Sequence, residues 1–292
     1  MPGFTSIRAY VAAEASGRTR RASLRKVPSN ASTAGWWVDL SMAPGNPQPN
    51  YYVGSPNVAT RLNYAGNSDG LRDGGIFHGD EVSPASLHIT EWMLETPTAG
   101  LVGPYQLLDY LLFYPFTDLD ATDTQVMDNT VTLPRYETGD GVCAMLVATA
   151  PTAGGGSFTF DYVNQDGVAK TAPTQSYSTA VANIQSIPTS EPATAAGGQP
   201  FLRLAGGDTG VRSITSWTNI SSGGGLGAIV LVKPLANTAI YEINTPSELS
   251  YITQHPAPPR VFDGAYLGMI MQCAATVAAG LLAGRISYAW SE

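Results

Sequence analysis

The clearest pattern of hydrophobic and polar positions lies in the second half of the chain. Residues 141–150, GVCAMLVATA, form a continuous apolar run, which is typical of a strand buried on both faces. Residues 157–163, SFTFDYV, alternate between aromatic and other side chains, as in a strand with one buried face. The Asp166-Gly167 pair that follows favours a tight turn, so the pattern predicts a β-hairpin here.

Three later segments have the same character. Residues 201–220 predict a second hairpin around their glycines, residues 227–235 predict a core strand, and residues 284–290 alternate. Predicted strands recur roughly every 10 to 15 residues and are separated by turns rich in Gly and Pro. This spacing predicts an all-β fold, either a β-sandwich or a jelly-roll-like arrangement.

An uncharged stretch, residues 265–284, is long enough to raise the question of a membrane span. Its glycines, its alanine pairs and its polar residues Gln272 and Thr276 instead favour two strands joined by a turn near residues 276–280. We therefore expect no membrane partner.

Residues 104–116, PYQLLDYLLFYPF, are the best candidate for a helix. Their four leucines fall on one helical face, Pro104 suits a first turn, and Pro115 would end the helix. Residues 4–14 are compatible with either a short helix or a strand. We predict one short helix in a protein that is otherwise β.

Residues 35–56 are rich in aromatic residues and proline. The prolines exclude a helix, so we predict extended chain lying on a surface. Its anchors are the aromatic residues Trp36, Trp37, Tyr51 and Tyr52. We expect these side chains to contact a partner protein, although packing in the chain's own core is an equal alternative for the two tryptophans.

Charge separates the N-terminal segment from the rest of the chain. The first 26 residues hold six basic side chains against one acid, a net charge of +5, whereas the whole chain carries −8, so the remainder carries −13. The basic residues are Arg8, Arg18, Arg20, Arg21, Arg25 and Lys26. We interpret residues 1–34 as a basic N-terminal arm of low intrinsic order, and residues 35–292 as a β-sandwich body that a boundary near residue 140 could subdivide.

An acidic protein surface is the favoured partner of this arm. The body behind the arm is itself acidic, and the arm has few aromatic side chains that could stack on bases. Nucleic acid bound through its phosphates, and a solvated tail without a partner, are the alternatives. Only 13% of the residues are charged, which suits a protein in permanent contact with copies or partners.

No segment carries a clear catalytic or cofactor-binding motif. The single D-T-G at residues 208–210 lacks the second carboxylate of an aspartic protease and favours a turn. Asp118, Asp120 and Asp123 could hold Ca²⁺, but their spacing departs from the EF-hand pattern and a solvated acidic loop is the simpler interpretation. The histidines are scattered and G-x-S-x-G is absent. We therefore expect a non-enzymatic protein without cofactor or metal.

Several segments, taken in order, resemble a group of tailed-bacteriophage virion structural proteins. They are WWVDLSMAPGNPQPNYYVGSP, IFHGDEVSPASLH, LLDYLLFYPFTDLDATDTQVMDNTVTLPRY, SFTFDYVNQDGV, GDTGVRSI and GAIVLVKPL. These motifs cover roughly residues 35–292, and none of them is catalytic. The basic arm lies outside the resemblance.

The resemblance implies a component of a virus particle, with a decoration or cement protein on the capsid exterior as the first choice. It also implies a jelly-roll-like fold, a homotrimer, and the major capsid protein or other virion proteins as partners. Nucleic acid is not expected as a partner. Two other roles stay open, namely a tail or baseplate protein that binds carbohydrate or a receptor, and the major capsid subunit.

Overall fold

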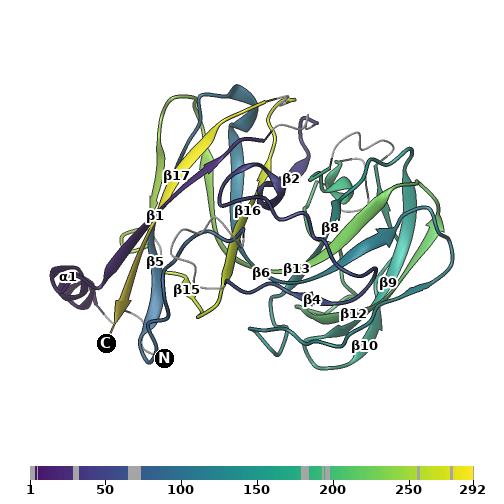
Figure 1. The fold of residues 1–292 in the computed structure, drawn as a ribbon, viewed down its shortest axis with the longest axis horizontal. Coiled ribbons are helices and arrows are strands. Elements are labelled where there is room, and N and C mark those ends of the chain that lie inside the picture. The colour runs from purple at the N-terminus through teal and green to yellow at the C-terminus, as the bar shows by residue number, and fades with distance from the viewer. Residues whose placement is uncertain are drawn as a thin grey trace.

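Two lobes of β-structure lie side by side in the computed structural model of the chain (Figure 1). The structure describes residues 4, 6–28, 33–64, 74–178, 184–192, 194, 198–254, 257–276 and 279–291. These residues form three antiparallel sheets, one α-helix and three short 3-10 helices. The prediction of an all-β sandwich fold is confirmed.

Sheet A forms the outer layer of the first lobe and joins segments from both ends of the chain. Its strands follow the order β14-β5-β17-β1-β3, and β15 also pairs with β5. Their bounds are β14 Ser247–Ser250, β5 Ser86–Glu95, β17 Leu282–Ser291, β1 Thr19–Lys26, β3 Gly45–Asn46 and β15 Arg260–Val261. Helix α1, Ile7–Ala15, precedes β1.

Sheet B lies between the two lobes, and sheet C belongs to the second lobe. Sheet B has the order β2-β16-β6-β13-β8 with β4 paired to β6, and sheet C has the order β10-β9-β12-β7 with β11 paired to β9. The bounds in sheet B are β2 Trp37–Asp39, β16 Tyr266–Gln272, β6 Gly103–Asp118, β13 Leu226–Ile240, β8 Cys143–Ala148 and β4 Thr60–Arg61. The bounds in sheet C are β10 Ala169–Thr171, β9 Gly156–Asn164, β12 Val211–Ser221, β7 Gln125–Val126 and β11 Gln175–Tyr177. The 3-10 helices are η1 Leu40–Met42, η2 Ala99–Leu101 and η3 Pro188–Ser190.

The long strands β6 and β13 pair with each other and run through both lobes (Figure 1). The first half of β6 places Tyr105 and Leu107 in the core shared with sheet A. Its second half places Leu112 and Tyr114 in the core shared with sheet C. Each lobe is therefore a two-layer sandwich, and the two lobes share sheet B.

Extended chain covers the opposite face of sheet B. Leu108 and Tyr110 of β6 project into a third core, where they meet Trp37, Met42 and Tyr52. The aromatic, proline-rich segment therefore packs against a sheet of the same chain, and its residues 37–39 join that sheet as strand β2.

The helix predicted over residues 104–116 is wrong, because this segment is strand β6. Sheet B is covered on both faces, so nearly every residue of β6 is buried and the alternation that marks a strand is lost. Pro115 fits because the pairing with β13 is irregular nearby and Phe116 has a φ of 56°. The α-helix of the described structure is α1, in the segment where the sequence leaves helix and strand open.

The prediction of an N-terminal arm of low intrinsic order is wrong for residues 19–26. They are strand β1, which pairs with residues 282–289 of β17 along its whole length. Ala22 and Leu24 enter the core between sheets A and B. The segment reads R-A-S-L-R, so apolar residues do alternate with polar ones, but the high charge obscures this period of two.

Of three further predictions, one is wrong and two agree with the structure. The hairpin at residues 201–220 is wrong, because β12 begins only at Val211 and residues 201–210 contain no strand. The hairpin around Asp166-Gly167 is confirmed by the pairing of β9 with β10. The two strands predicted in residues 265–284 are also present, as β16 and the start of β17, but they belong to different sheets.

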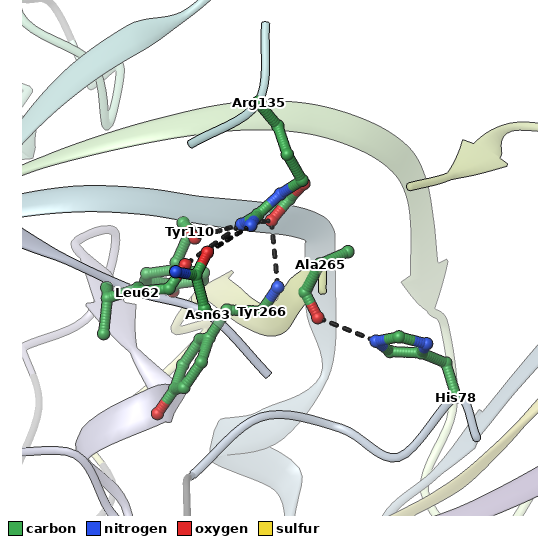
Figure 2. Close-up of polar contacts among 8 residues, drawn as sticks. Leu62, Asn63, His78, Tyr110, Arg135, Ala265 and Tyr266 are labelled. Carbon is green, nitrogen blue, oxygen red and sulfur yellow. Dashed lines mark hydrogen bonds and ion pairs between the residues drawn. The ribbon is translucent and has the colours of Figure 1, made fainter. Parts of the chain in front are cut away.

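A buried ion pair ties the loop before β8 to strand β6 (Figure 2). Arg135 Nε donates to Asp109 Oδ2 at 2.8 Å, and Arg135 Nη2 donates to Asp109 Oδ1 at 2.7 Å. The guanidinium also donates to Asn63 Oδ1 at 2.8 Å and to the carbonyl oxygens of Leu62 and Tyr110, each at 3.1 Å. All of these atoms lie within the fold, since the two charged side chains are 5% and 0% exposed.

The carboxylate of this pair is satisfied from a second strand. The Tyr266 N–H of β16 donates to Asp109 Oδ1 at 3.0 Å. Burial raises the pKa of Asp109, while the Arg135 guanidinium opposes that shift. Because three N–H groups point at its oxygens, Asp109 acts as an acceptor only, as an ionised carboxylate does. The pair thus joins β6, β16 and two loops around one buried charge.

Replacing Arg135 should therefore destabilise the protein strongly. Arg135→Met leaves Asp109 buried without its cation, and we expect the free energy of unfolding to fall by about 3–5 kcal/mol. Denaturant titration followed by circular dichroism measures this change. The matched control is Arg21→Met, which removes an exposed arginine and should change the free energy of unfolding by less than about 0.5 kcal/mol. Equal effects of the two substitutions would contradict the role of the pair.

Candidate functional site

The solvent side of sheet A, which we call the outer face, is the candidate interaction site. Strand β1 alternates along its length, with Ala22 and Leu24 buried and Arg21, Ser23 and Arg25 exposed. This alternation directs every second side chain away from the core. The basic residues of β1 thereby reach solvent from a strand that is fixed by its neighbour β17.

Strand register aligns the outward side chains of sheet A in rows. The first row comprises Ser250, Glu91, Ser287 and Arg21. The second row comprises Glu248, Met93, Arg285 and Ser23. The third row comprises Glu95, Ala283 and Arg25. Each row therefore has an acidic residue on β5 or β14 and ends on β1.

The two sides of the outer face carry opposite charge. Arg21 and Arg25 stand on β1, whereas Glu95 and Glu248 stand on β5 and β14. All four side chains are exposed, and none of them makes an ion pair or side-chain hydrogen bond within the described residues. One intervening strand separates Arg25 from Glu95, a lateral distance of about 10 Å, and both side chains leave the same face of the sheet side by side instead of pointing towards each other.

The centre of the outer face is neutralised internally. Arg285 of β17 lies between the two charged sides, and its Nη2 is 2.5 Å from Glu91 Oε1. Both side chains are partly exposed, at 38% and 25%. This pair holds Glu91 in place and leaves Arg21, Arg25, Glu95 and Glu248 as the charges available to a partner.

Helix α1 lies at one end of the outer face (Figure 1). Ser6 caps its first turn by accepting from the Ala9 N–H at 3.1 Å. The ring of Phe4, just before the helix, lies 5.9 Å from that of His88 on β5. Ile7 and Val11 of α1 lie largely in solvent, with 66% and 55% of their surface exposed. Because they stand four residues apart, they form one apolar stripe next to the charged rows.

Lys26 does not belong to this exposed set. It is 2% exposed, and its ammonium donates to the carbonyl oxygens of Ala43 and Pro47 at 3.1 and 2.7 Å. Burial lowers the pKa of Lys26 to about 8. Its role in the chain is to tie β1 to the backbone on both sides of β3, so the expectation that it contacts a partner does not hold.

Arg20 is also engaged within the chain. It donates to the carbonyl oxygen of His78 at 3.1 Å, and its guanidinium carbon lies 4.8 Å from the ring centroid of Trp290. Arg18 is half-buried. The basic residues that remain exposed are Arg8, Arg21 and Arg25.

The four aromatic anchors divide in a similar way. Trp36 and Trp37 are each 6% exposed, and Tyr52 is fully buried. Of these four residues only Tyr51, at 46% exposure, reaches solvent. Core packing is thus the outcome for the tryptophan pair, and contact with another protein stays a prediction for Tyr51.

Tyr52 belongs to a buried polar cluster around Asp39. Tyr52 donates its hydroxyl hydrogen to Asp39 Oδ2, Tyr110 donates to Asp39 Oδ1 at 2.7 Å, and the Ser41 N–H donates to the same oxygen at 2.9 Å. Burial raises the pKa of Asp39, and these hydrogen bonds oppose the shift. The cluster is closed from solvent and joins the extended segment to β6, so its role is structural.

The aspartates considered for metal or protease chemistry accept hydrogen bonds from nearby groups of the chain. Asp118 Oδ1 accepts from the Asp120 N–H at 2.8 Å, and Asp120 Oδ1 accepts from the Ser222 hydroxyl. Asp208 of the D-T-G accepts from Tyr162 and Asn164, which lowers its pKa. Across the described ranges, no three His, Cys, Asp or Glu side chains gather as a metal ion requires.

The calcium site considered for Asp118, Asp120 and Asp123 is therefore not formed by the described residues. No helix in the described part of the chain is long and apolar enough to cross a membrane.

No family model and no curated protein matches the chain. Two solved structures of virus particles are similar to it. A crystal structure of the VP2 subviral particle of infectious bursal disease virus is 8% identical, with 93% of this chain and 80% of that chain covered and a TM-score of 0.17. A structure of T=1 particles derived from infectious bursal virus is 10% identical, with 93% and 77% covered and a TM-score of 0.17. A TM-score this low is below that of chains sharing a fold, so it supports no conclusion about this one.

The acidic half of the outer face is absent from the sequence-based candidates. Glu95 and Glu248 lie about 150 residues apart in the sequence, and both lie far from Arg25. Only the pairing of β5 with β14 and β17 brings them onto one surface. Alternation along each strand could have indicated which side faces outward, but not which strands are neighbours.

A buried histidine next to the ion pair makes stability depend on pH. His78 Nε2 lies 2.8 Å from the carbonyl oxygen of Ala265 (Figure 2), and burial lowers the pKa of His78 to about 4. The unfolded chain takes up a proton on His78 below about pH 6.5, whereas the folded chain does so only near pH 4. The stability that His78 contributes as a neutral ring is therefore present above pH 6.5 and lost as the pH falls towards 4.

We expect the substitution His78→Gln to remove this part of the pH dependence. The free energy of unfolding of the wild type should fall by up to about 3 kcal/mol more than that of the variant between pH 7 and pH 4. Urea titrations of both proteins across this range measure the difference, and the remaining carboxylates titrate equally in both. Parallel curves for the two proteins would contradict the assignment.

Proposed function

We propose that this chain is a non-enzymatic structural protein of a virus particle and that it binds other proteins of the particle through the outer face of sheet A. In finer terms, it is a decoration or cement protein on the exterior of a bacteriophage capsid, with the major capsid protein or other virion proteins as its partners. The motif resemblance over residues 35–292 supports the particle, and the chemistry of the surface supports binding.

The observation that carries this proposal is the presence of Arg21 and Arg25 on a paired strand. Both side chains are exposed and lack an ion pair within the described residues, so their charges are available to a partner. A strand holds them at fixed spacing. Binding therefore costs less conformational entropy than the docking of a flexible arm would. This smaller cost favours affinity.

The polar clusters of the chain support a role without catalysis. Asp109 with Arg135, and Asp39 with its tyrosines, are buried and bonded within the fold. Neither cluster faces the solvent where a substrate would approach. Their geometry serves stability, which a protein exposed on a particle needs.

Binding of this kind stabilises a shell by mass action. A protein that binds only the assembled shell shifts the equilibrium towards assembly, and the shift grows with its affinity and concentration. A chain with 13% charged residues offers wide neutral surfaces around the few charges that set its orientation. Neutral surface for contact area and a few charges for orientation suit a protein that binds across neighbouring subunits.

Reversal of the two arginines should weaken binding to the particle. We expect Arg21→Glu/Arg25→Glu to bind shells prepared without this chain about tenfold or more weakly than the wild type, because two attractive contacts become repulsive. Co-sedimentation with bare shells at low and high salt measures the affinity. Wild-type binding should itself weaken with salt, since exposed charges are screened.

A single charge reversal elsewhere provides the control. Lys170→Glu changes one exposed base on β10 in the second lobe, and Arg25→Glu changes one on β1. Weaker binding for Arg25→Glu alone supports the outer face as the contact. Equal binding by both variants, or wild-type binding to a glycan and not to shells, would overturn the proposal. Deleting residues 1–26 is a poor test, because it removes a strand from sheet A.

A further inference from the structure

We propose that, in the absence of a shell, the outer face pairs with a second copy of this chain, related by a two-fold axis parallel to the strands of sheet A. This inference rests on the proposed function in that it uses the same outer face, which a second copy occupies when no shell protein is bound there.

The outer face is complementary to itself. Its basic side carries Arg21 and Arg25, and its acidic side carries Glu95 and Glu248, with β17 between them. All four are exposed, and no ion pair within the described residues uses them. A two-fold contact presents the same patch on both subunits. The acidic side of each subunit then faces the basic side of the other, so the same contact forms twice.

The direction of the axis follows from the rows. An axis along the strands and above β17 exchanges the two sides of the sheet and keeps each row at its own height. Arg25 of one copy then faces Glu95 of the other, because both lie in the row that contains Ala283. An axis across the strands would instead place arginine over arginine, and like charges in contact are repulsive.

The distances between packed sheets suit such contacts. Two sheets that pack face to face lie about 10 Å apart, which an arginine and a glutamate side chain can span together. Arg285 would lie near the axis in both copies, but its charge is already matched by Glu91 at 2.5 Å. The centre of the contact therefore needs no further countercharge.

Helix α1 adds apolar surface to the same contact. Ile7 and Val11 are 66% and 55% exposed, at the end of the face where α1 lies. An axis along the strands brings the α1 helices of the two copies to the same end of the pair. Apolar residues beside charged rows match the composition of protein interfaces, which combine an apolar part with a polar rim. This pairing joins copies in twos and differs from the homotrimer that the resemblance implies.

The test is a charge exchange between two variants of the full chain, in the absence of any shell. Arg21→Glu/Arg25→Glu makes the face acidic on both sides, and Glu95→Arg/Glu248→Arg makes it basic on both sides. Sedimentation equilibrium measures self-association of the wild type, of each variant and of their mixture. Circular dichroism shows that each variant retains the fold, since both replace exposed residues.

We expect the wild type to form dimers that weaken with salt. Each variant alone should have a dissociation constant raised about tenfold or more, and the mixture should associate as tightly as the wild type, because both contacts are restored. A monomeric wild type, or a mixture no tighter than the separate variants, would overturn the inference. Loss of shell binding by the arginine variant together with a monomeric wild type would leave the proposed function standing and place the acidic partner on another virion protein.

Discussion

Pairing between β1 and β17 brings residues near both ends of the chain into the middle of one sheet. Residues 19–26 meet residues 282–289 without a break in register, and β17 then pairs with β5 on its other edge. Ala22 and Leu24 close the core of the first lobe from this strand. Without β1, sheet A would lose its basic side and this core would open to water.

The second lobe depends on the first through strands β6 and β13. These strands run from one sandwich into the other, so sheet B is packed against sheet A, sheet C and the extended segment. The buried pair of Asp109 with Arg135 fastens a loop to β6 between the two lobes. A buried charge is tolerated there because all three nitrogens of the guanidinium donate hydrogen bonds, two of them to the carboxylate of Asp109.

The same packing determines what the sequence could reveal. The alternating residues of β9 and its Asp166-Gly167 turn identify a hairpin, because one face of sheet C is solvated. Strand β6 is apolar on both faces, so its leucines fit a helix as well as a strand. In β1 the charge of the arginines hides the alternation of Ala22 and Leu24. The acidic side of the outer face depends on pairing between distant segments, which a single sequence does not specify.

The basic N-terminal segment contributes a strand to the outer face and is not a flexible tether. A tether would offer its arginines in many orientations, whereas a strand offers Arg21 and Arg25 in one orientation and buries Lys26. The acidic residues on β5 and β14 lie on the opposite side of the sheet from these arginines. A partner must therefore carry acidic groups opposite one side and basic groups opposite the other. Specificity of this kind comes from the arrangement of charge more than from its amount.

Limited proteolysis with trypsin tests most directly whether this segment is a strand. Trypsin cuts after arginine and lysine, and five of these residues lie between Arg18 and Lys26. A paired strand resists cleavage, so cutting after Arg21 and Arg25 should be as slow as cutting after Arg285 on β17. Rapid release of the first 26 residues from an otherwise intact chain would contradict the account.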